Sequence, residues 1–138
     1  MASGQPPAQD KKGILSHRIL IVDDSAPIRR ALRACLEEGD DWEVCGEAGD
    51  GNDALKLVKE LSPDLIVLDL SMPGMNGFQL ARELKSLNSL LPVLMFTSFK
   101  TPQLEKEALG CGCDAVVSKS ENQQMLFDNI HRLLGQAS

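Results

Sequence analysis

Residues 63–77 are Pro63-Asp64-Leu65-Ile66-Val67-Leu68-Asp69-Leu70-Ser71-Met72-Pro73-Gly74-Met75-Asn76-Gly77. Within this stretch, the uninterrupted apolar run 65–68 between turn-forming residues is typical of a parallel strand that is covered on both faces. The run ends at the carboxylate of Asp69. Ligands of open α/β sheets bind beyond the carboxyl ends of the strands, so Asp69 is a candidate functional residue. An aspartate that caps the Met-Pro-Gly turn is the alternative interpretation of this position.

Further apolar segments predict strands on either side of this one. These strands are expected at 18–22, 42–48, 92–96 and 114–117. The segments between them carry apolar residues at helical spacing and predict helices, one beginning after Asp24 or Ser25 and the others at 52–61, 78–87, 101–109 and 122–134. The helix at 101–109 has a thin apolar face, so we expect it to be the least firmly packed.

Strands alternate with helices along the chain, which predicts a parallel sheet with right-handed crossovers and helices on both faces. We therefore predict a doubly wound α/β domain. In such a sheet the carboxyl ends of the strands meet at one edge. The side chains expected at that edge are Asp23 and Asp24 after the first strand, Asp69 after the third, Thr97 after the fourth and Lys119 after the fifth.

These side chains suit phosphoryl chemistry. The carboxylates of Asp23, Asp24 and Asp69 would repel one another unless a positive charge lies among them, and removing Asp23 or Asp24 should relieve that repulsion. A hard divalent cation such as Mg²⁺ is a suitable partner, because it prefers carboxylate and carbonyl oxygens and often bridges to phosphate. Lys119 would add a second positive charge, and Thr97 a hydrogen-bond donor. Together these groups can stabilise a transferring phosphoryl group, with an aspartate as its covalent acceptor.

The length of the chain is that of a single domain. Its 138 residues are enough to bury a substantial core. Residues 1–16 are rich in Gln, Pro, Ser and Gly, a composition that predicts a flexible N-terminal arm. The domain itself is expected at 17–135, followed by a short tail at 136–138.

The charge and hydropathy of the chain exclude other functions. The sequence has 14 basic and 20 acidic residues, with a formal net charge of -6. This acidic excess argues against direct nucleic-acid binding, and Arg29, Arg30 and Arg33 are interpreted as the solvated face of a helix. No apolar run is as long as a membrane span and no signal peptide is evident, so a cytoplasmic location without membrane contact is expected.

The cysteines are expected to act as small hydrophobic residues. Cys35, Cys45, Cys111 and Cys113 lie in apolar or helical contexts, which is compatible with reduced thiols. A metal site at Cys111-Gly112-Cys113 is not favoured, because no second pair of ligands lies nearby in the sequence.

Several separate motifs occur in an order that resembles the receiver domain of two-component response regulators. They are Val22-Asp23-Asp24-Ser25 with Arg29-Arg30 beyond it, Ala48-x-x-Gly51-x-x-Ala54-Leu55, Pro63-Asp64-Leu65-Ile66-Val67-Leu68-Asp69, Met72-Pro73-Gly74-Met75-Asn76-Gly77, Thr97-Ser98 and Lys119. The resemblance covers the chain from about Arg18 to Leu134. It implies a flavodoxin-like fold with a five-stranded parallel sheet in the order 2-1-3-4-5.

The resemblance also implies a function and a set of site residues. The chain would be a phosphorylation-dependent switch rather than an enzyme, and Asp69 would take a phosphoryl group from a sensor histidine kinase or a phosphotransfer protein. Thr97 and Lys119 would contact the phosphoryl group. The implied ligands of Mg²⁺ are Asp23, Asp24, Asp69 and the backbone carbonyl of Ser71.

The resemblance further implies a surface for partners, near which the sequence departs from the family. The face formed by the fourth helix, fifth strand and fifth helix would meet an output domain, a second copy of the chain or a downstream protein. The position three before the lysine, often Tyr or Phe in receivers, is Val116, and the position after it, often a proline on a cis bond, is Ser120. A cis bond before serine would cost about 3 kcal/mol. Both departures affect the predicted switch geometry, and neither touches the phosphorylation residues.

Two other classes of protein compete with the switch. An aspartyl-phosphate hydrolase of small phosphate esters would usually carry a second acid two residues after the nucleophile, to protonate the leaving group, and that position is Ser71. A flavin or nucleotide carrier would need glycines in the turn after the first strand, which is Asp23-Asp24-Ser25-Ala26-Pro27. The sequence therefore favours the switch.

Overall fold

The structure, a computed structural model, describes residues 16–39 and 41–135. The predicted N-terminal arm lies outside the described residues except for Ser16, and the predicted tail at 136–138 lies outside them as well. Within the described part, strands and helices alternate as the sequence predicts.

Five parallel strands form one sheet in the order β2-β1-β3-β4-β5. Their bounds are β1 His17–Val22, β2 Trp42–Ala48, β3 Leu65–Leu68, β4 Val93–Thr97 and β5 Ala115–Ser118. The strand order and the doubly wound architecture confirm the predicted flavodoxin-like fold. The bounds of β2 and β3 match the prediction, while β4 and β5 begin and end one residue later than predicted.

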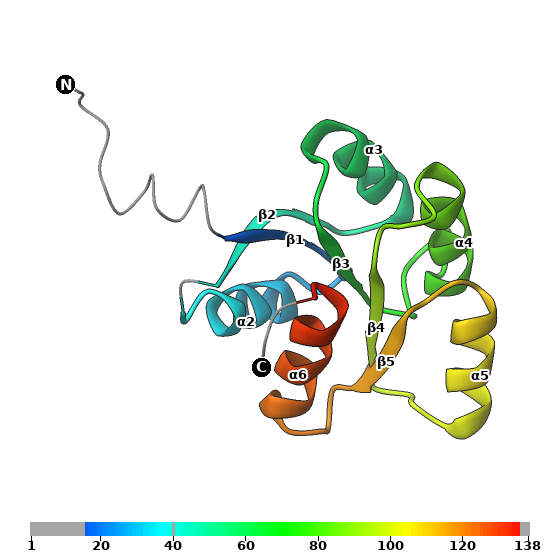
Figure 1. Cartoon of the computed structure of the whole chain (residues 1–138). Helices are drawn as coiled ribbons and strands as arrows, with labels where there is room; N and C mark the ends of the chain where they lie inside the picture. The colour runs from blue at the N-terminus through cyan, green and yellow to red at the C-terminus, as the bar shows by residue number, and fades with distance from the viewer. Residues whose placement is uncertain (1–15, 40, 136–138) are drawn as a thin grey trace.

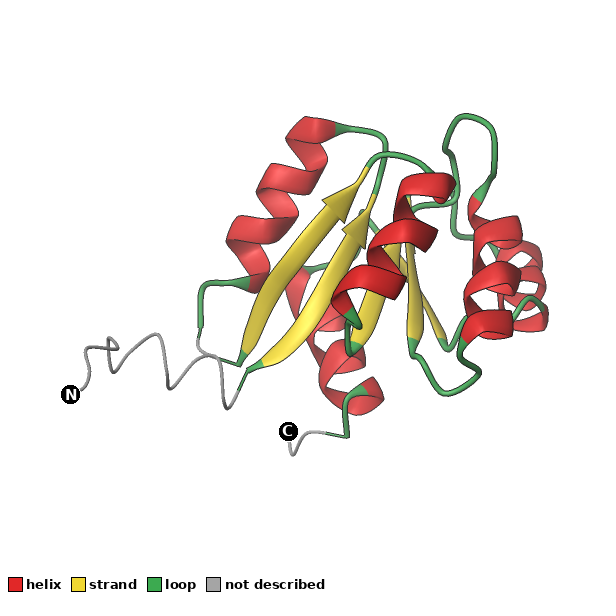
Figure 2. Cartoon of the chain, turned by 90° about the horizontal axis from the view of Figure 1, so that it is seen from above, coloured by secondary structure: helices red, strands yellow, loops and turns green. Residues whose placement is uncertain are grey.

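Helices cover both faces of the sheet (Figures 1 and 2), with α2 and α6 on one face and α3, α4 and α5 on the other. Their bounds are α2 Ala26–Leu36, α3 Gly51–Leu61, α4 Gly77–Leu87, α5 Pro102–Gly110 and α6 Gln123–Leu133. Each helix follows a residue whose side-chain oxygen accepts a hydrogen bond from a backbone N–H of the first turn, which satisfies one otherwise unpaired donor. These N-cap residues are Ser25, Asp50, Asn76, Thr101 and Asn122.

The sheet separates two hydrophobic cores. Leu20 and Ile66 face the core under α3, α4 and α5, whereas Ile21 and Val67 face the core under α2 and α6. All four residues of β3 are buried, as the uninterrupted apolar run predicts. The helix α5 buries only Ala108, which agrees with its thin apolar face. The strand β3 is therefore covered on both faces, and α5 buries fewer residues than any other described helix.

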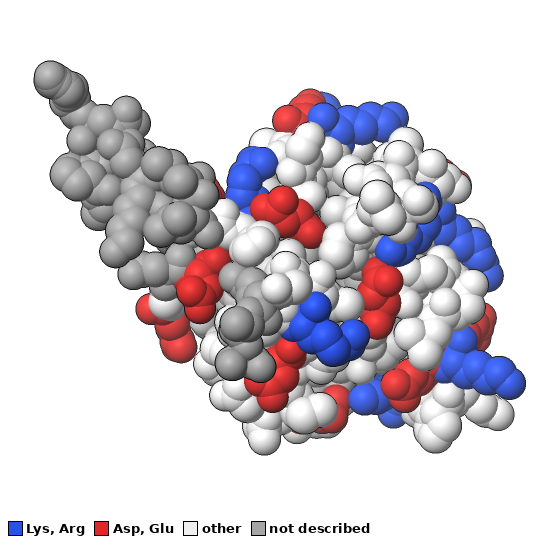
Figure 3. Space-filling model, viewed as in Figure 1, with Lys and Arg blue, Asp and Glu red and all other residues white. Residues whose placement is uncertain are grey.

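In residues 16–39 and 41–135, no helix combines the length and the apolar character that a membrane crossing requires. Acidic and basic side chains are interspersed on the face that Figure 3 shows.

Cys35, Cys45, Cys111 and Cys113 are free thiols, and burial raises the pKa of the Cys113 thiol to about 12, which is typical of an unreactive core cysteine.

Candidate functional site

Backbone hydrogen bonds between neighbouring strands place the predicted site residues at one edge of the sheet. The backbone N–H of Asp69 donates to the Val22 carbonyl at 2.9 Å, which sets the end of β3 beside the end of β1. The N–H of Lys119 donates to the Thr97 carbonyl at 2.9 Å, which sets the end of β5 beside the end of β4. The parallel register thus brings together side chains that lie far apart in the sequence.

The three predicted acids converge at this edge. Asp23, Asp24 and Asp69 each offer a carboxylate oxygen, and these oxygens lie within 4.8 Å of one another. Asp23 and Asp69 are only 4% and 7% exposed, whereas Asp24 is exposed. A hollow on this side of the molecule is lined by both Asp24 and Ser71. An open hollow beside converging carboxylates fits a hard divalent cation that keeps several of its waters, such as Mg²⁺.

Lys119 supplies a positive charge to this cluster. Its Nζ lies 2.9 Å from Asp23 Oδ2 and 3.4 Å from Asp69 Oδ1. Burial raises the pKa of the Asp69 carboxyl above its ordinary value, and the nearby Asp23 adds to that rise, while Lys119 partly offsets it. The surroundings of Asp69 therefore destabilise its ionised form, and an additional cation would reduce that destabilisation.

Thr97 connects the site to the loop that leads into α5. Its side chain is fully buried, and its Oγ1 accepts a hydrogen bond from the backbone N–H of Phe99 at 3.2 Å. One residue further, Lys100 Nζ lies 3.4 Å from Glu121 Oε1, which joins this loop to the loop after β5. Phe99 and Glu121 were not identified from the sequence, because isolated loop residues carry no periodic signal. Phe99 is 59% exposed, so a movement of Thr97 would reach the surface.

The turn after Asp69 depends on the absence of a side chain at Gly77. A Cβ at this position would lie 2.6 Å from the Asp69 carbonyl oxygen and 2.8 Å from Leu70 Cα. The Gly77 N–H donates to the Leu70 carbonyl at 2.9 Å. Glycine therefore lets α4 begin directly against the loop that presents Asp69.

The two positions that depart from the receiver pattern have plain structural roles here. Val116 is buried in β5 and belongs to the core under α3, α4 and α5. The peptide bond between Lys119 and Ser120 is trans. The Ser120 N–H donates to Ser118 Oγ at 3.1 Å, so the loop after β5 is closed by serine side chains.

The structure corrects the interpretation of the arginines of α2. Arg30 is exposed, as expected for a solvated face. Arg29 and Arg33, however, both bind Glu47 of β2, with Nε to carboxylate oxygen distances of 3.1 and 2.7 Å. The helical period placed these residues away from the core, but a long arginine side chain can still reach a neighbouring strand.

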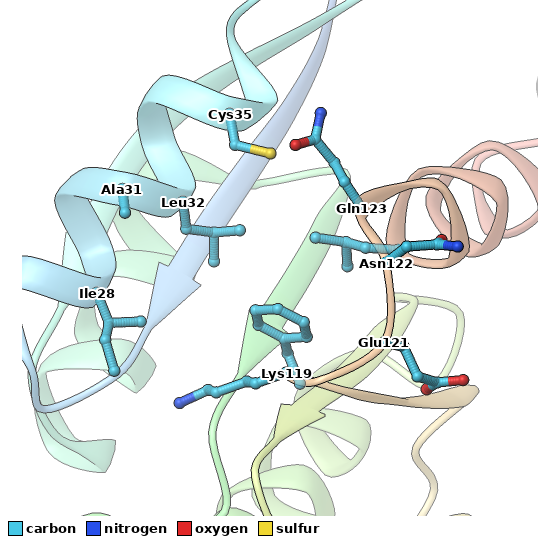
Figure 4. Close-up of a pocket in the computed structure, with 10 residues that line it drawn as sticks. Ile28, Ala31, Leu32, Cys35, Lys119, Glu121, Asn122 and Gln123 are labelled. Atoms are coloured by element: carbon cyan, nitrogen blue, oxygen red, sulfur yellow. The ribbon is translucent and has the colours of Figure 1, made fainter.

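An apolar groove runs between α2 and α6 beside the site (Figure 4). One wall carries Ile28, Leu32 and Cys35 of α2. The opposite wall carries Gln123 of α6. Leu126 of the same helix also lines the groove. Lys119 lies at the end of the groove, so the groove opens towards the carboxylate cluster.

The fold and the three converging carboxylates together define a doubly wound domain of the flavodoxin-like class with an acidic edge. Residues 19–131 match the response regulator receiver domain family, and the chain belongs to this family. Members of the family are signalling switches of two-component systems.

Individual relatives agree with this assignment. The chemotaxis protein CheY of Halobacterium salinarum is 32% identical over 87% of this chain and 98% of its own length. The transcriptional regulatory protein YdfI of Bacillus subtilis is 32% identical to this chain. The match covers 80% of this chain but only 52% of the length of YdfI. A LuxR-family two-component response regulator from Aurantimonas has a solved structure that is 30% identical, with a TM-score of 0.84 over 88% of this chain and 87% of that one.

The structure separates the expected effects of removing the two acids after β1. Asp24 is exposed and adds repulsion to its neighbours, so Asp24→Ala should weaken Mg²⁺ binding and leave the metal-free protein as stable as before or more stable. Asp23→Ala should also weaken Mg²⁺ binding, yet lower metal-free stability by about 1–3 kcal/mol. The reason is that Asp23 binds Lys119 at 2.9 Å and accepts from the Ser25 N–H at 2.9 Å.

Thermal melts of both variants with and without Mg²⁺ measure these effects. A shared relief of repulsion, as expected from the sequence, would raise the metal-free melting temperature of both variants. A rise for Asp23→Ala would therefore contradict the structural role of its carboxylate.

Proposed function

We propose that this receiver domain is a phosphorylation-dependent switch, in which Asp69 takes a phosphoryl group from a phosphohistidine of a sensor histidine kinase or a phosphotransfer protein. The observation that carries this proposal is the carboxylate of Asp69 at the end of a buried strand, with Lys119 Nζ at 3.4 Å and two further carboxylates beside it. The family assignment supports the same function.

The chemical step requires a carboxylate nucleophile and stabilised charge. An Asp69 oxygen attacks phosphorus, a P–O bond forms, and the P–N bond of the phosphohistidine breaks with its electron pair passing to the imidazole. Lys119 offers an ammonium group to the oxygens of the transferring group, and the Thr97 hydroxyl can donate to one of them. Thr97 ends β4, which neighbours β3, and Lys119 follows β5, the next strand of the sheet.

A metal ion would complete the charge balance of the site. Asp23, Asp24, Asp69 and the backbone carbonyl of Ser71 would hold Mg²⁺. When bound, the ion neutralises negative charge on the phosphoryl oxygens. The convergence of the three carboxylates within 4.8 Å supports this assignment.

The switch is favoured over hydrolysis of small phosphate esters. A hydrolase would need an acid near Asp69 to protonate the leaving alcohol, and the residue two positions after it is Ser71. A phosphohistidine donor needs no such acid on this chain, because imidazole is a better leaving group than an alkoxide.

We propose that the signal leaves the site through Thr97 and the loop before α5. When the Thr97 hydroxyl turns towards the phosphoryl group, the hydrogen bond from the Phe99 N–H is altered and the loop moves. The helix α5 can follow because only Ala108 of this helix is buried. The face made of α5, β5 and α6 would then present a changed surface to an output domain, a second copy or a downstream protein. Val116 cannot act as an aromatic switch, since its branched side chain has few rotamers.

Amide exchange tests this route. Phosphorylation, or binding of a beryllofluoride mimic with Mg²⁺, should change exchange most in residues 97–109 and little at Val116. Thr97→Ala should still accept the phosphoryl group. Its amide exchange in residues 97–109 should change much less on phosphorylation, because the variant has no hydroxyl to move. Thr97→Ser keeps the hydroxyl and is the matched control. A change confined to Val116 and α6, with residues 97–109 constant, would rule out the loop route.

A further inference from the structure

We propose that Arg29 is a positioning residue for the metal pocket, because it fixes the peptide unit that joins Asp23 to Asp24. This inference rests on the proposed function, in which these two acids hold Mg²⁺. Arg29 itself does not touch the site of phosphoryl transfer, so its effect passes through the backbone of the acids.

The contacts of Arg29 point in two directions. Its Nη1 donates to the backbone carbonyl oxygen of Asp23. Its Nε donates to Glu47 Oε1 at 3.1 Å, and Glu47 is in turn held by Arg33 at 2.7 Å. The Arg29 side chain is only 19% exposed. Arg29 therefore ties the loop after β1 to a fixed point on β2.

This tie acts on both acids at once. A peptide unit is planar, so the carbonyl of Asp23 and the N–H of Asp24 rotate together. The Asp23 carboxylate has further support from Lys119 and from the Ser25 N–H. Among the described residues, none donates a hydrogen bond to the Asp24 carboxylate. The orientation of Asp24 therefore depends on the peptide unit that Arg29 holds.

The geometry of the guanidinium group matters for this role. Arginine offers donors on both Nε and Nη in one rigid plane, so it can bind a carboxylate and a carbonyl at the same time. A lysine has one ammonium group on a flexible chain and cannot reproduce that fork. Arg29→Lys therefore keeps the charge and removes the bridge.

Arg33 provides a matched control within the same network. It binds Glu47 and donates to the Val44 carbonyl at 3.3 Å, so the contacts it makes lie on β2 and at the C-terminal end of α2. Glu47 with its two partners, Arg29 and Arg33, forms what we call the Glu47 cluster. Arg33→Gln removes one positive charge from this cluster, as Arg29→Gln does. It leaves the donor to the Asp23 carbonyl in place.

A charge effect and a positioning effect have opposite signs. Removing a positive charge near the acids should favour a bound cation and tighten Mg²⁺ binding. Loss of positioning should weaken Mg²⁺ binding, because the two carboxylates no longer start from the binding arrangement. The direction of the change therefore identifies the mechanism.

The test measures the Mg²⁺ dissociation constant of the full chain by calorimetry, together with the metal-free melting temperature. Five proteins are compared: the natural sequence, Arg29→Gln, Arg29→Lys, Arg33→Gln and Asp24→Ala. Arg29→Gln should weaken Mg²⁺ binding about tenfold, as is common when a group that orients a metal ligand is removed. Arg29→Lys should weaken it in the same direction. Arg33→Gln should bind Mg²⁺ as the natural sequence does, or more tightly. This should hold even if its melting temperature falls as much as that of Arg29→Gln.

Three outcomes overturn the inference. Unchanged or tighter binding by Arg29→Gln would leave only a charge or stability role for this residue. Equal weakening by Arg33→Gln would show that general loss of the Glu47 cluster is responsible. If the natural sequence itself binds no Mg²⁺, the proposed metal pocket fails and this inference fails with it. Where the first outcome is seen beside normal binding by the natural sequence and loss of binding by Asp24→Ala, the role of Arg29 alone fails and the metal pocket stands. If Arg29→Gln does not fold, Arg29→Lys decides the question.

Discussion

Asp69→Asn should take up no phosphoryl group under conditions that label the natural sequence fully. The amide of asparagine has no carboxylate oxygen to attack phosphorus, while Asp23, Thr97 and Lys119 remain in place around it. Intact-mass analysis after incubation with a phosphohistidine donor and Mg²⁺ measures this directly. We expect labelling of the variant to fall by at least about a hundredfold, the scale of removing a nucleophile.

The same variant should be more stable than the natural sequence at neutral pH when no metal is present. Burial raises the pKa of Asp69 in the folded protein, so the ionised carboxylate lowers stability as the pH rises through that pKa. The advantage of asparagine should therefore disappear in acid, below the ordinary aspartate pKa of about 4. Melting curves over a pH series, with Mg²⁺ removed by a chelator, measure this difference.

Asp128→Asn is the control for both experiments. Asp128 is an exposed carboxylate on α6, outside the acid cluster. Its amide variant should be labelled as the natural sequence is, with unchanged pH dependence. Undiminished labelling of Asp69→Asn would mean that another residue accepts the phosphoryl group.

Lys119→Met should give the largest loss of metal-free stability among the site variants. It removes the positive charge that lies 2.9 Å from Asp23 and 3.4 Å from Asp69. The side chains of these two acids are only 5% and 9% exposed, so their charges would remain almost buried without a partner. Breaking a buried pair in this way costs about 3 kcal/mol.

Mg²⁺ should reverse most of that loss. The ion and the Lys119 ammonium compete for the same carboxylates, so Lys119→Met should bind Mg²⁺ more tightly than the natural sequence and gain more stability from it. Lys106→Met, at an exposed position of α5, is the control and should change neither quantity. If Lys119→Met were as stable as the natural sequence in the absence of metal, the lysine would not be the counter-charge of the acids.

Most of the fold follows from local patterns in the sequence. The apolar run 65–68 predicts a strand covered on both faces, and β3 occupies those residues. Ser25 and Thr101 are capping residues at the predicted helix starts, and both accept hydrogen bonds from the first turn. Because parallel strands end at one edge, the order of strands and helices also predicts which side chains meet there.

The sequence does not predict the directions in which long side chains and loops point. Periodicity assigns Arg29 to the outer face of a helix, yet this residue reaches the Asp23 carbonyl and Glu47. Gly77 belongs to a turn motif, but only the structure reveals that a Cβ there would collide with the Asp69 carbonyl. The contact between Lys100 and Glu121 joins two loops that no local pattern relates.

The residue that carries the phosphoryl group can be identified directly in the protein of natural sequence. After incubation with a phosphohistidine donor and Mg²⁺, reduction with borohydride converts an aspartyl phosphate into homoserine, and peptide mass analysis finds the modified residue. We expect homoserine at position 69, and none when a chelator removes Mg²⁺. Modification at another aspartate or at a histidine, or labelling that persists without metal, would contradict it.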